Sequence, residues 1–157
     1  MRRFYTLLMV LALGACAETP RASLDAAREA LAESRYADAI AAADAGLAGD
    51  ANAVTSWGLE LVKLEALARD GRGEEALAQL EELAGLRPEH MPAAQYSATA
   101  DQLRAAGQGG AAIQVLDAGL GRFPEDETLL GLIEEAKAAP APGSEELEML
   151  RSLGYVD

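Results

Sequence analysis

The sequence feature that most constrains the fold is a stretch that occurs in three imperfect copies, at residues 34–53, 71–90 and 107–126. The clearest copy, 71–90, opens on Gly71, continues as a helical run and closes near Pro88. A Gly permits the dihedrals of a tight turn, and a Pro cannot continue a helix. Each copy therefore predicts a turn followed by a helix, and three copies predict an array in which each unit packs on its neighbours.

The composition favours helices. The chain has 157 residues, it is rich in Ala and Glu, and only 4% of its residues are aromatic. Ala and Glu form helices well, whereas a sheet of any size needs more β-branched and aromatic residues. We therefore expect an all-α chain of one domain.

The charge balance limits the possible partners. The formal net charge is -13. Such a surface repels phosphate backbones and anionic headgroups, so nucleic acid is not an expected partner. The charge has two readings that the sequence leaves open: it keeps the protein soluble, or it attracts a basic protein partner.

Apolar periodicity and capping signals place the helices. Ser23 is the expected N-cap of the first helix, which ends before Ser34. Asp126 and Ser144 are the expected caps of the last two. The helices after the first, including these last two, are expected at 36–47, 54–69, 74–86, 92–104, 110–121, 127–137 and 145–153.

Ala39, Ala76 and Ala112 occupy the same place in the three copies, 37 and 36 residues apart. This pattern resembles the tetratricopeptide repeat (TPR) family, whose period is 34 residues. The residues that match the family are the turn glycines at 71 and 107, the aromatic Tyr36, the three small residues at helix crossings, and the terminating Pro88 and Pro124. In the first copy Ser34 replaces the turn Gly and Ala51 replaces the Pro.

The resemblance implies a solenoid of antiparallel helix pairs, with repeats at 23–53, 54–91 and 92–125 and a capping helix at 126–138. An unrelated helical bundle is the alternative. Gly46 and Gly119 depart from the Ala that is usual in the family, and we expect each to weaken its helix by roughly 0.5 to 1 kcal/mol relative to Ala.

The resemblance also implies a binding site. Members of the family bind peptides in a concave groove lined by the first helix of each pair, although ordinary packing remains the alternative for every residue mapped there. The Lys and Asn clamp that some co-chaperones of the family use is not matched. The groove candidates are Leu24, Arg28, Leu31, Leu61, Glu65, Ala68, Ser97, Asp101 and Arg104.

The first sixteen residues have the pattern of a secretory signal: Arg2 and Arg3, an apolar run, then small residues. Leu13-Gly14-Ala15-Cys16 resembles the lipobox of bacterial lipoproteins. The resemblance implies that residues 1–15 are removed and that Cys16 carries a diacylglycerol, with 16–22 as a tether. An ordinary signal peptide is the alternative. Ala17 is not the Asp of an inner-membrane signal, so in a Gram-negative source we expect the periplasmic face of the outer membrane.

The inventory of reactive side chains is small. His90 is the only histidine and Cys16 the only cysteine, so the usual zinc sets and a Ser-His-Asp arrangement have no support. We expect no enzyme activity, no metal, no cofactor and no small-molecule substrate.

The C-terminal part reads as a linker at 139–143 and a helical tail at 144–157, with Leu147, Leu150 and Leu153 on one side. The ending LRSLGYVD resembles a segment of sulfatase-like proteins, without transferring activity. The tail either packs on the array's last helix or docks a partner. We expect an adaptor for an envelope protein or peptide, held at the membrane only by its lipid; the alternative is an accessory subunit of a periplasmic sulfatase-like or phosphatase-like hydrolase.

Overall fold

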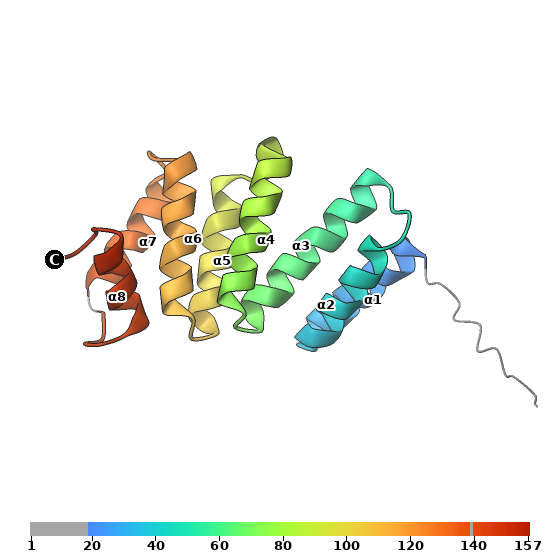
Figure 1. The fold of residues 1–157 in the computed structure, drawn as a ribbon, viewed down its shortest axis with the longest axis horizontal. Coiled ribbons are helices and arrows are strands. Elements are labelled where there is room, and N and C mark those ends of the chain that lie inside the picture. Colours follow the sequence, from blue (N-terminus) through green and yellow to red (C-terminus); the bar gives the residue numbers. More distant parts are fainter. Residues whose placement is uncertain (1–18, 139) are drawn as a thin grey trace, which may run out of the picture.

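The computed structural model describes residues 19–138 and 140–157, and over these ranges the protein is all-α, without strands (Figure 1). The described segments form eight α-helices and one short 3-10 helix, η1. Their bounds are α1 Pro20–Ala32, α2 Tyr36–Leu47, α3 Ala53–Arg69, α4 Gly73–Leu86, η1 Pro88–His90, α5 Ala93–Ala105, α6 Gly109–Arg122, α7 Glu127–Ala138 and α8 Glu145–Ser152.

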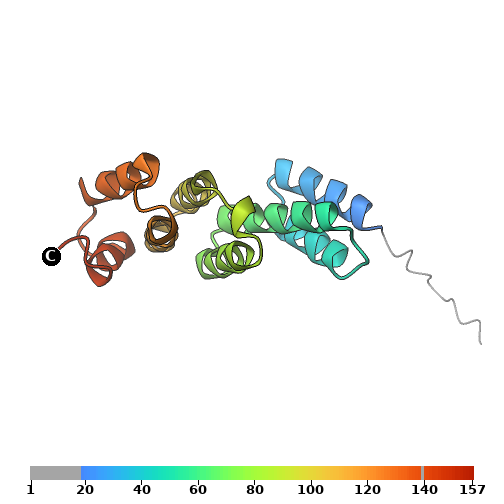
Figure 2. The same ribbon diagram turned by 90° about the horizontal axis from the view of Figure 1, so that it is seen from above.

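The helices form an elongated array in two layers, which Figure 2 shows from above. Contacts along one layer join α1 to α3, α3 to α5 and α5 to α7, and contacts along the other join α4 to α6 and α6 to α8. Successive helices such as α1 and α2, or α5 and α6, pack as antiparallel hairpins. The molecule is therefore long in one direction, and each helix contacts mainly its neighbours.

The hairpin turns share one backbone device. Ser34, Gly71 and Gly107 lie in the left-handed region, with φ of 60°, 74° and 78°. In each case the next residue donates its N–H to a carbonyl five residues earlier, as Arg72 does to Leu67 at 3.0 Å. This geometry closes the helix end and reverses the chain. Gly154 repeats it after α8, with φ 80°.

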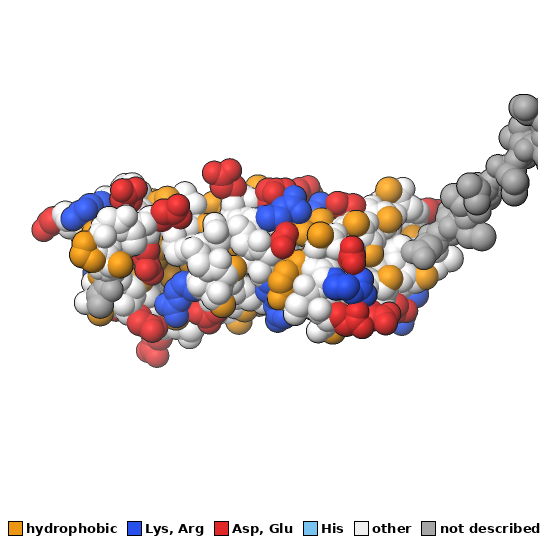
Figure 3. Space-filling model, turned by 90° about the horizontal axis from the view of Figure 1, so that it is seen from below, with side chains coloured by type: hydrophobic (Ala, Val, Ile, Leu, Met, Phe, Trp, Pro, Cys, Tyr) orange, Lys and Arg blue, Asp and Glu red, His pale blue; other side chains and the backbone are white. Residues whose placement is uncertain are grey.

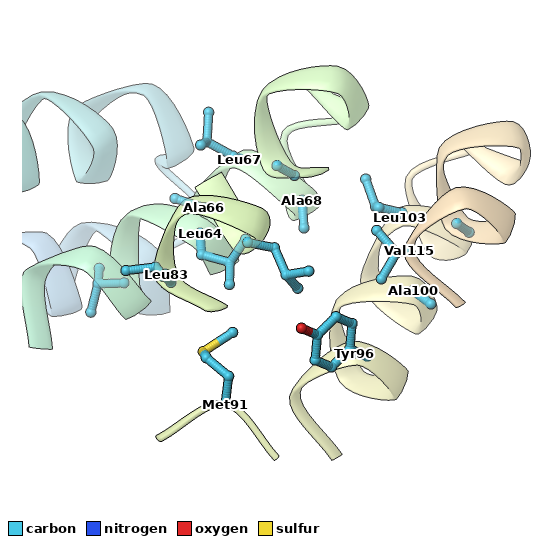
Figure 4. Packing of buried hydrophobic residues seen from close by; sticks show 14 of the residues in the cluster. Leu64, Ala66, Leu67, Ala68, Leu83, Met91, Tyr96, Ala100, Leu103 and Val115 are labelled. Atoms are coloured by element: carbon cyan, nitrogen blue, oxygen red, sulfur yellow. The ribbon is translucent and has the colours of Figure 1, made fainter. Parts of the chain in front are cut away.

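The core lies between the two layers and runs continuously along the array. Ala39, Ala76 and Ala112 are completely buried, as their expected place at helix crossings requires. Figure 4 shows the middle of this core, where Met91 and Tyr96 lie between α3 and α4 on one side and α5 and α6 on the other. Tyr96 also meets the ring of Phe123 edge to face, with centroids 6.0 Å apart.

The start of α1 differs from the sequence prediction. Thr19, not Ser23, is the N-cap, and its hydroxyl accepts a hydrogen bond from the Ala22 N–H at 3.3 Å. Pro20 fits the first helical position because its missing N–H needs no partner there. Ser23 is instead buried inside the helix, so the predicted tether of 16–22 loses Pro20–Ala22 to α1. Residues 1–15, Cys16 and Ala17 lie outside the described residues.

Gly46 and Gly119, both inside helices, are sites of close approach. A Cβ built on Gly46 would lie 2.9 Å from Ser23 Cβ and 2.8 Å from a methyl carbon of Leu59. A Cβ on Gly119 would lie 3.0 Å from Tyr96 Cβ and 3.0 Å from a methyl carbon of Leu129. Neighbouring helices occupy the space that a methyl group needs, so the propensity cost expected of these glycines does not make Ala a better fit there.

The C-terminal caps are confirmed. Asp126 accepts hydrogen bonds from the N–H groups of Thr128 and Leu129 at 3.1 and 3.0 Å, and Ser144 accepts one from Leu147 at 3.2 Å. The described part of the predicted linker, 140–143, is not helical.

The tail packs on its own array, but chiefly against α6 rather than α7, which was the expected last helix. Leu150 is fully buried, whereas Leu153 is exposed and does not complete the predicted apolar side. The Tyr155 hydroxyl donates a hydrogen bond of 2.7 Å to Asp117 on α6. Burial, and then this bond, raises the pKa of Tyr155 to about 12.

Candidate functional site

Three of the nine predicted groove residues belong to the core. Leu24 is 5% exposed, Leu31 9% and Ala68 0%. The apolar side of each first helix packs onto neighbouring helices. Apolar residues at helical spacing on these helices therefore indicate burial in the core and not a binding surface. The prediction that these three line a groove is therefore wrong.

The other six candidates reach the surface to different degrees. Arg28 and Asp101 are exposed. Glu65, Ser97 and Arg104 are half-buried, and so is Leu61, which packs against the core cluster. Of these six, Asp101 lines a pocket that draws on three successive hairpins. Arg104 lines a second pocket, between the α5–α6 turn and the start of α8.

That pocket lies at the turn end of the array, where α2 begins and α3 and α5 end. It has a volume of about 420 Å³ and draws on three successive hairpins. Figure 3 views this end, where acidic and basic side chains are interspersed with hydrophobic ones. The lining residues, which we call the three-hairpin pocket, are Tyr36, Arg69, Asp101, Gln102, Ala105 and Ala106.

Ion pairs organise the charged side chains around the pocket. Arg69 pairs with Glu65 one turn earlier on α3, at 2.6 Å. Arg104 lies 3.7 Å from Asp101 and 3.9 Å from Glu135 on α7. Partly exposed pairs of this kind contribute little stability, roughly 0 to 1 kcal/mol each. Their consequence is positional, because they hold a guanidinium and a carboxylate at the rim beside the phenol of Tyr36.

The pocket combines a phenol, a guanidinium, a carboxylate and an amide with two alanine methyl groups. Such a set can donate and accept hydrogen bonds and can pair with either charge. It suits the backbone and polar side chains of an extended segment. Ala105 and Ala106 add apolar surface to the lining.

Sequence reasoning missed Tyr36, Arg69 and Gln102 as pocket residues. Tyr36 was recognised only as the aromatic that follows a turn. Arg69 stands two residues before Gly71, so the turn signal could have placed it at the turn end. Which three helix ends converge there depends on how hairpins stack, and no local signal carries that information.

The possible reactive groups are dispersed. His90 is exposed, and its Nε2 lies 3.6 Å from Glu89 Oε1. Among the described residues, no group of three or more His, Cys, Asp or Glu side chains could hold a metal ion. No helix within residues 19–138 and 140–157 is long and apolar enough to span a membrane.

Comparison of the chain with family models, with curated proteins and with solved structures gave no match. The fold and the pocket are therefore the basis for a functional assignment.

Proposed function

We propose that this protein is a non-enzymatic adaptor that binds an extended segment of a partner protein in the three-hairpin pocket. The observation that carries the proposal is the pocket's origin, since Tyr36, Arg69 and Asp101 come from three successive hairpins. A site of this kind suits a ligand that runs along the array rather than a compact molecule.

We further propose that the array is a TPR solenoid. The repeated left-handed turn at 34, 71 and 107 and the buried alanines at 39, 76 and 112 support this reading. The packing of α8 on α6 continues the second layer, so α7 and α8 act as a fourth, sequence-divergent pair. A solenoid needs such an end because its last repeat would otherwise expose a face built for packing.

The lipid anchor on Cys16 is part of the same proposal. The basic start, the apolar run and the Leu13-Gly14-Ala15-Cys16 box support it. Stable anchoring needs at least two acyl chains, which a diacylglycerol supplies. The protein would then be held at the periplasmic face of the outer membrane, and its partner would be an envelope protein or peptide.

The alternative, an accessory subunit of a periplasmic sulfatase-like hydrolase, rests on the tail's sequence. The described tail residues pack on α6, and we find no observation that favours this alternative.

Two substitutions test the proposal in cells. Cys16→Ser should move the protein from the membrane fraction to the soluble fraction, as measured by fractionation and immunoblotting.

Arg69→Glu should lower the yield of crosslinked partner about tenfold, because it reverses the charge at the pocket. Arg122→Glu, an exposed site at the end of α6, is the matched control. An unchanged set of crosslinked partners with Arg69→Glu would overturn the pocket assignment.

A further inference from the structure

A second surface feature lies at the opposite end of the helices from the three-hairpin pocket. Val54 and Leu86 are 82% and 68% exposed, the two most exposed large hydrophobic side chains of the described residues. Val54 stands in the first turn of α3 and Leu86 in the last turn of α4. Trp57, Arg87 and His90 lie at the same end of these two helices. We call these five residues together the Trp57 patch.

The centre of the patch is built around Trp57. The Arg87 guanidinium lies over its ring, 5.4 Å from the centroid, and the His90 ring lies 5.7 Å away at 51°. Trp57 is half-buried and is the only tryptophan of the chain. An indole with one apolar side and one polar neighbour is typical of the boundary between water and an apolar phase.

The patch shares its end of the array with the beginning of α1. A Cβ built on Gly49, in the connection from α2 to α3, would lie 3.1 Å from Pro20 Cγ. A Cβ on Gly58, one residue after Trp57, would lie 3.1 Å from Leu24 Cδ2. In Figure 1 the beginnings of α1 and α3 and the end of α4 are the upper ends of their helices. The beginning of α1 therefore lies next to the N-terminal part of α3 and to the connection that precedes it.

The length of chain before α1 limits where the patch can be. Cys16 is three residues before Thr19, so a lipid on Cys16 would hold Thr19 within about 11 Å of the anchored residue. A bilayer surface at that distance lies next to the end of the array that carries the Trp57 patch.

We propose that the Trp57 patch rests on the surface of the bilayer to which the protein is anchored. This inference relies on the proposed lipid anchor. Val54 and Leu86 would enter the boundary between headgroups and acyl chains, and Trp57 and Arg87 would lie at headgroup level. The net charge of -13 disfavours attraction to anionic lipid, so the contact is apolar in origin.

The consequence is an orientation. With this end on the membrane, the turn end with Tyr36 and Arg69 faces away from it. The three-hairpin pocket would then be presented to proteins in the periplasm rather than to lipid.

The only tryptophan makes the proposal measurable. The full, lipidated chain, purified from bacterial membranes, is inserted into phosphatidylcholine vesicles with or without brominated acyl chains, and Trp57 fluorescence is recorded. Brominated lipid should quench at least half of the emission. Val54→Asp combined with Leu86→Asp should reduce the quenching at least twofold, whereas Leu130→Asp combined with Leu153→Asp, at the other exposed hydrophobic positions, should leave it unchanged.

The outcomes separate the two proposals. If Cys16→Ser leaves the protein in the membrane fraction, the lipid anchor is wrong. If the anchored protein floats with the vesicles but brominated lipid does not quench Trp57, the anchor stands and the orientation is overturned. Equal quenching in the Val54 and Leu86 double variant, with an unchanged helical circular-dichroism spectrum, would also overturn the orientation.

Discussion

Gly46 and Gly119 mark places where neighbouring helices approach each other closely, and they occupy equivalent places in the first and third copies. The second copy has Leu83 at that place, and Leu83 is buried. The size of the side chain at this position of a repeat is therefore set by the space between the helices that cross there. A helix-propensity scale ranks Gly below Ala at any of them, but packing decides the order here.

Replacement of Gly46 by Ala should lower the free energy of unfolding by about 1 to 3 kcal/mol, because the new methyl group would displace Ser23 and Leu59. Gly131→Ala, in α7 with open space around it, is the matched control and should raise that free energy by about 0.5 to 1 kcal/mol. Urea denaturation of both variants measures the difference. A Gly46→Ala protein as stable as the parent would show that α1, α2 and α3 can separate at little cost.

At the scale of elements, α8 shows how a short helix is held. It has eight residues, too few for stability on its own. Ser144 caps the beginning of α8, and Gly154, in the left-handed region, closes its end. Leu150, in the helix itself, is buried. Tyr155 then joins the residues after the helix to Asp117. Tertiary contact with α6, more than propensity, is the reason that this segment is helical.

The Tyr155 bond predicts a pH dependence. Its pKa, raised to about 12, exceeds the value of about 10 expected in the unfolded chain. The neutral phenol therefore stabilises the fold below pH 10, and this contribution is lost as the pH rises from about 10 to 12. Tyr155→Phe should lower the free energy of unfolding by about 1 kcal/mol at pH 8 and by less at pH 11.5.

Urea denaturation at the two pH values measures the effect. Tyr36→Phe is the control for the loss of a phenol, since we find no hydrogen bond of its hydroxyl within the described residues. A Tyr155→Phe deficit that is the same at both pH values would contradict the role of the bond to Asp117.

For the whole molecule, the important property is that each helix contacts only its near neighbours, in its own layer and in the other. Stability in such an array is distributed, so a change at one end need not reach the other. The two ends of the helices also differ in chemistry, with the three-hairpin pocket at one and the Trp57 patch at the other.

Removal of residues 144–157 tests this independence. The deletion uncovers the side of α6 that packs on Leu150, whose burial is worth about 1.5 to 3 kcal/mol. Amide protection in α6 should fall at least tenfold, while protection in α1, α2 and α3 stays within twofold. Hydrogen exchange read by mass spectrometry measures both regions. An equal loss of protection along the chain would show instead that the molecule unfolds as one unit.

Much of the local structure could be predicted from the sequence. The bounds of α2 agree with the prediction at both ends, and those of α3, α4 and α6 agree within one residue. Asp126, Ser144 and the turn residues at 71 and 107 act within a few residues of themselves, so their signals are legible in one dimension. The start of α1 was misplaced because Ser23 and Thr19 are both plausible caps, and only the packing of Ser23 against Gly46 separates them.

The sequence by itself determined the class of fold, the helices and the turns, because periodicity, caps and left-handed glycines are local properties. The tertiary structure alone decided which surface the helices leave free. Leu24, Leu31 and Ala68 are buried in the core. Tyr36, Arg69 and Asp101, from three hairpins, line one pocket, and the tail packs on α6. Each of these outcomes depends on the angle and stagger at which hairpins stack, and that geometry comes from contacts between residues far apart in the chain.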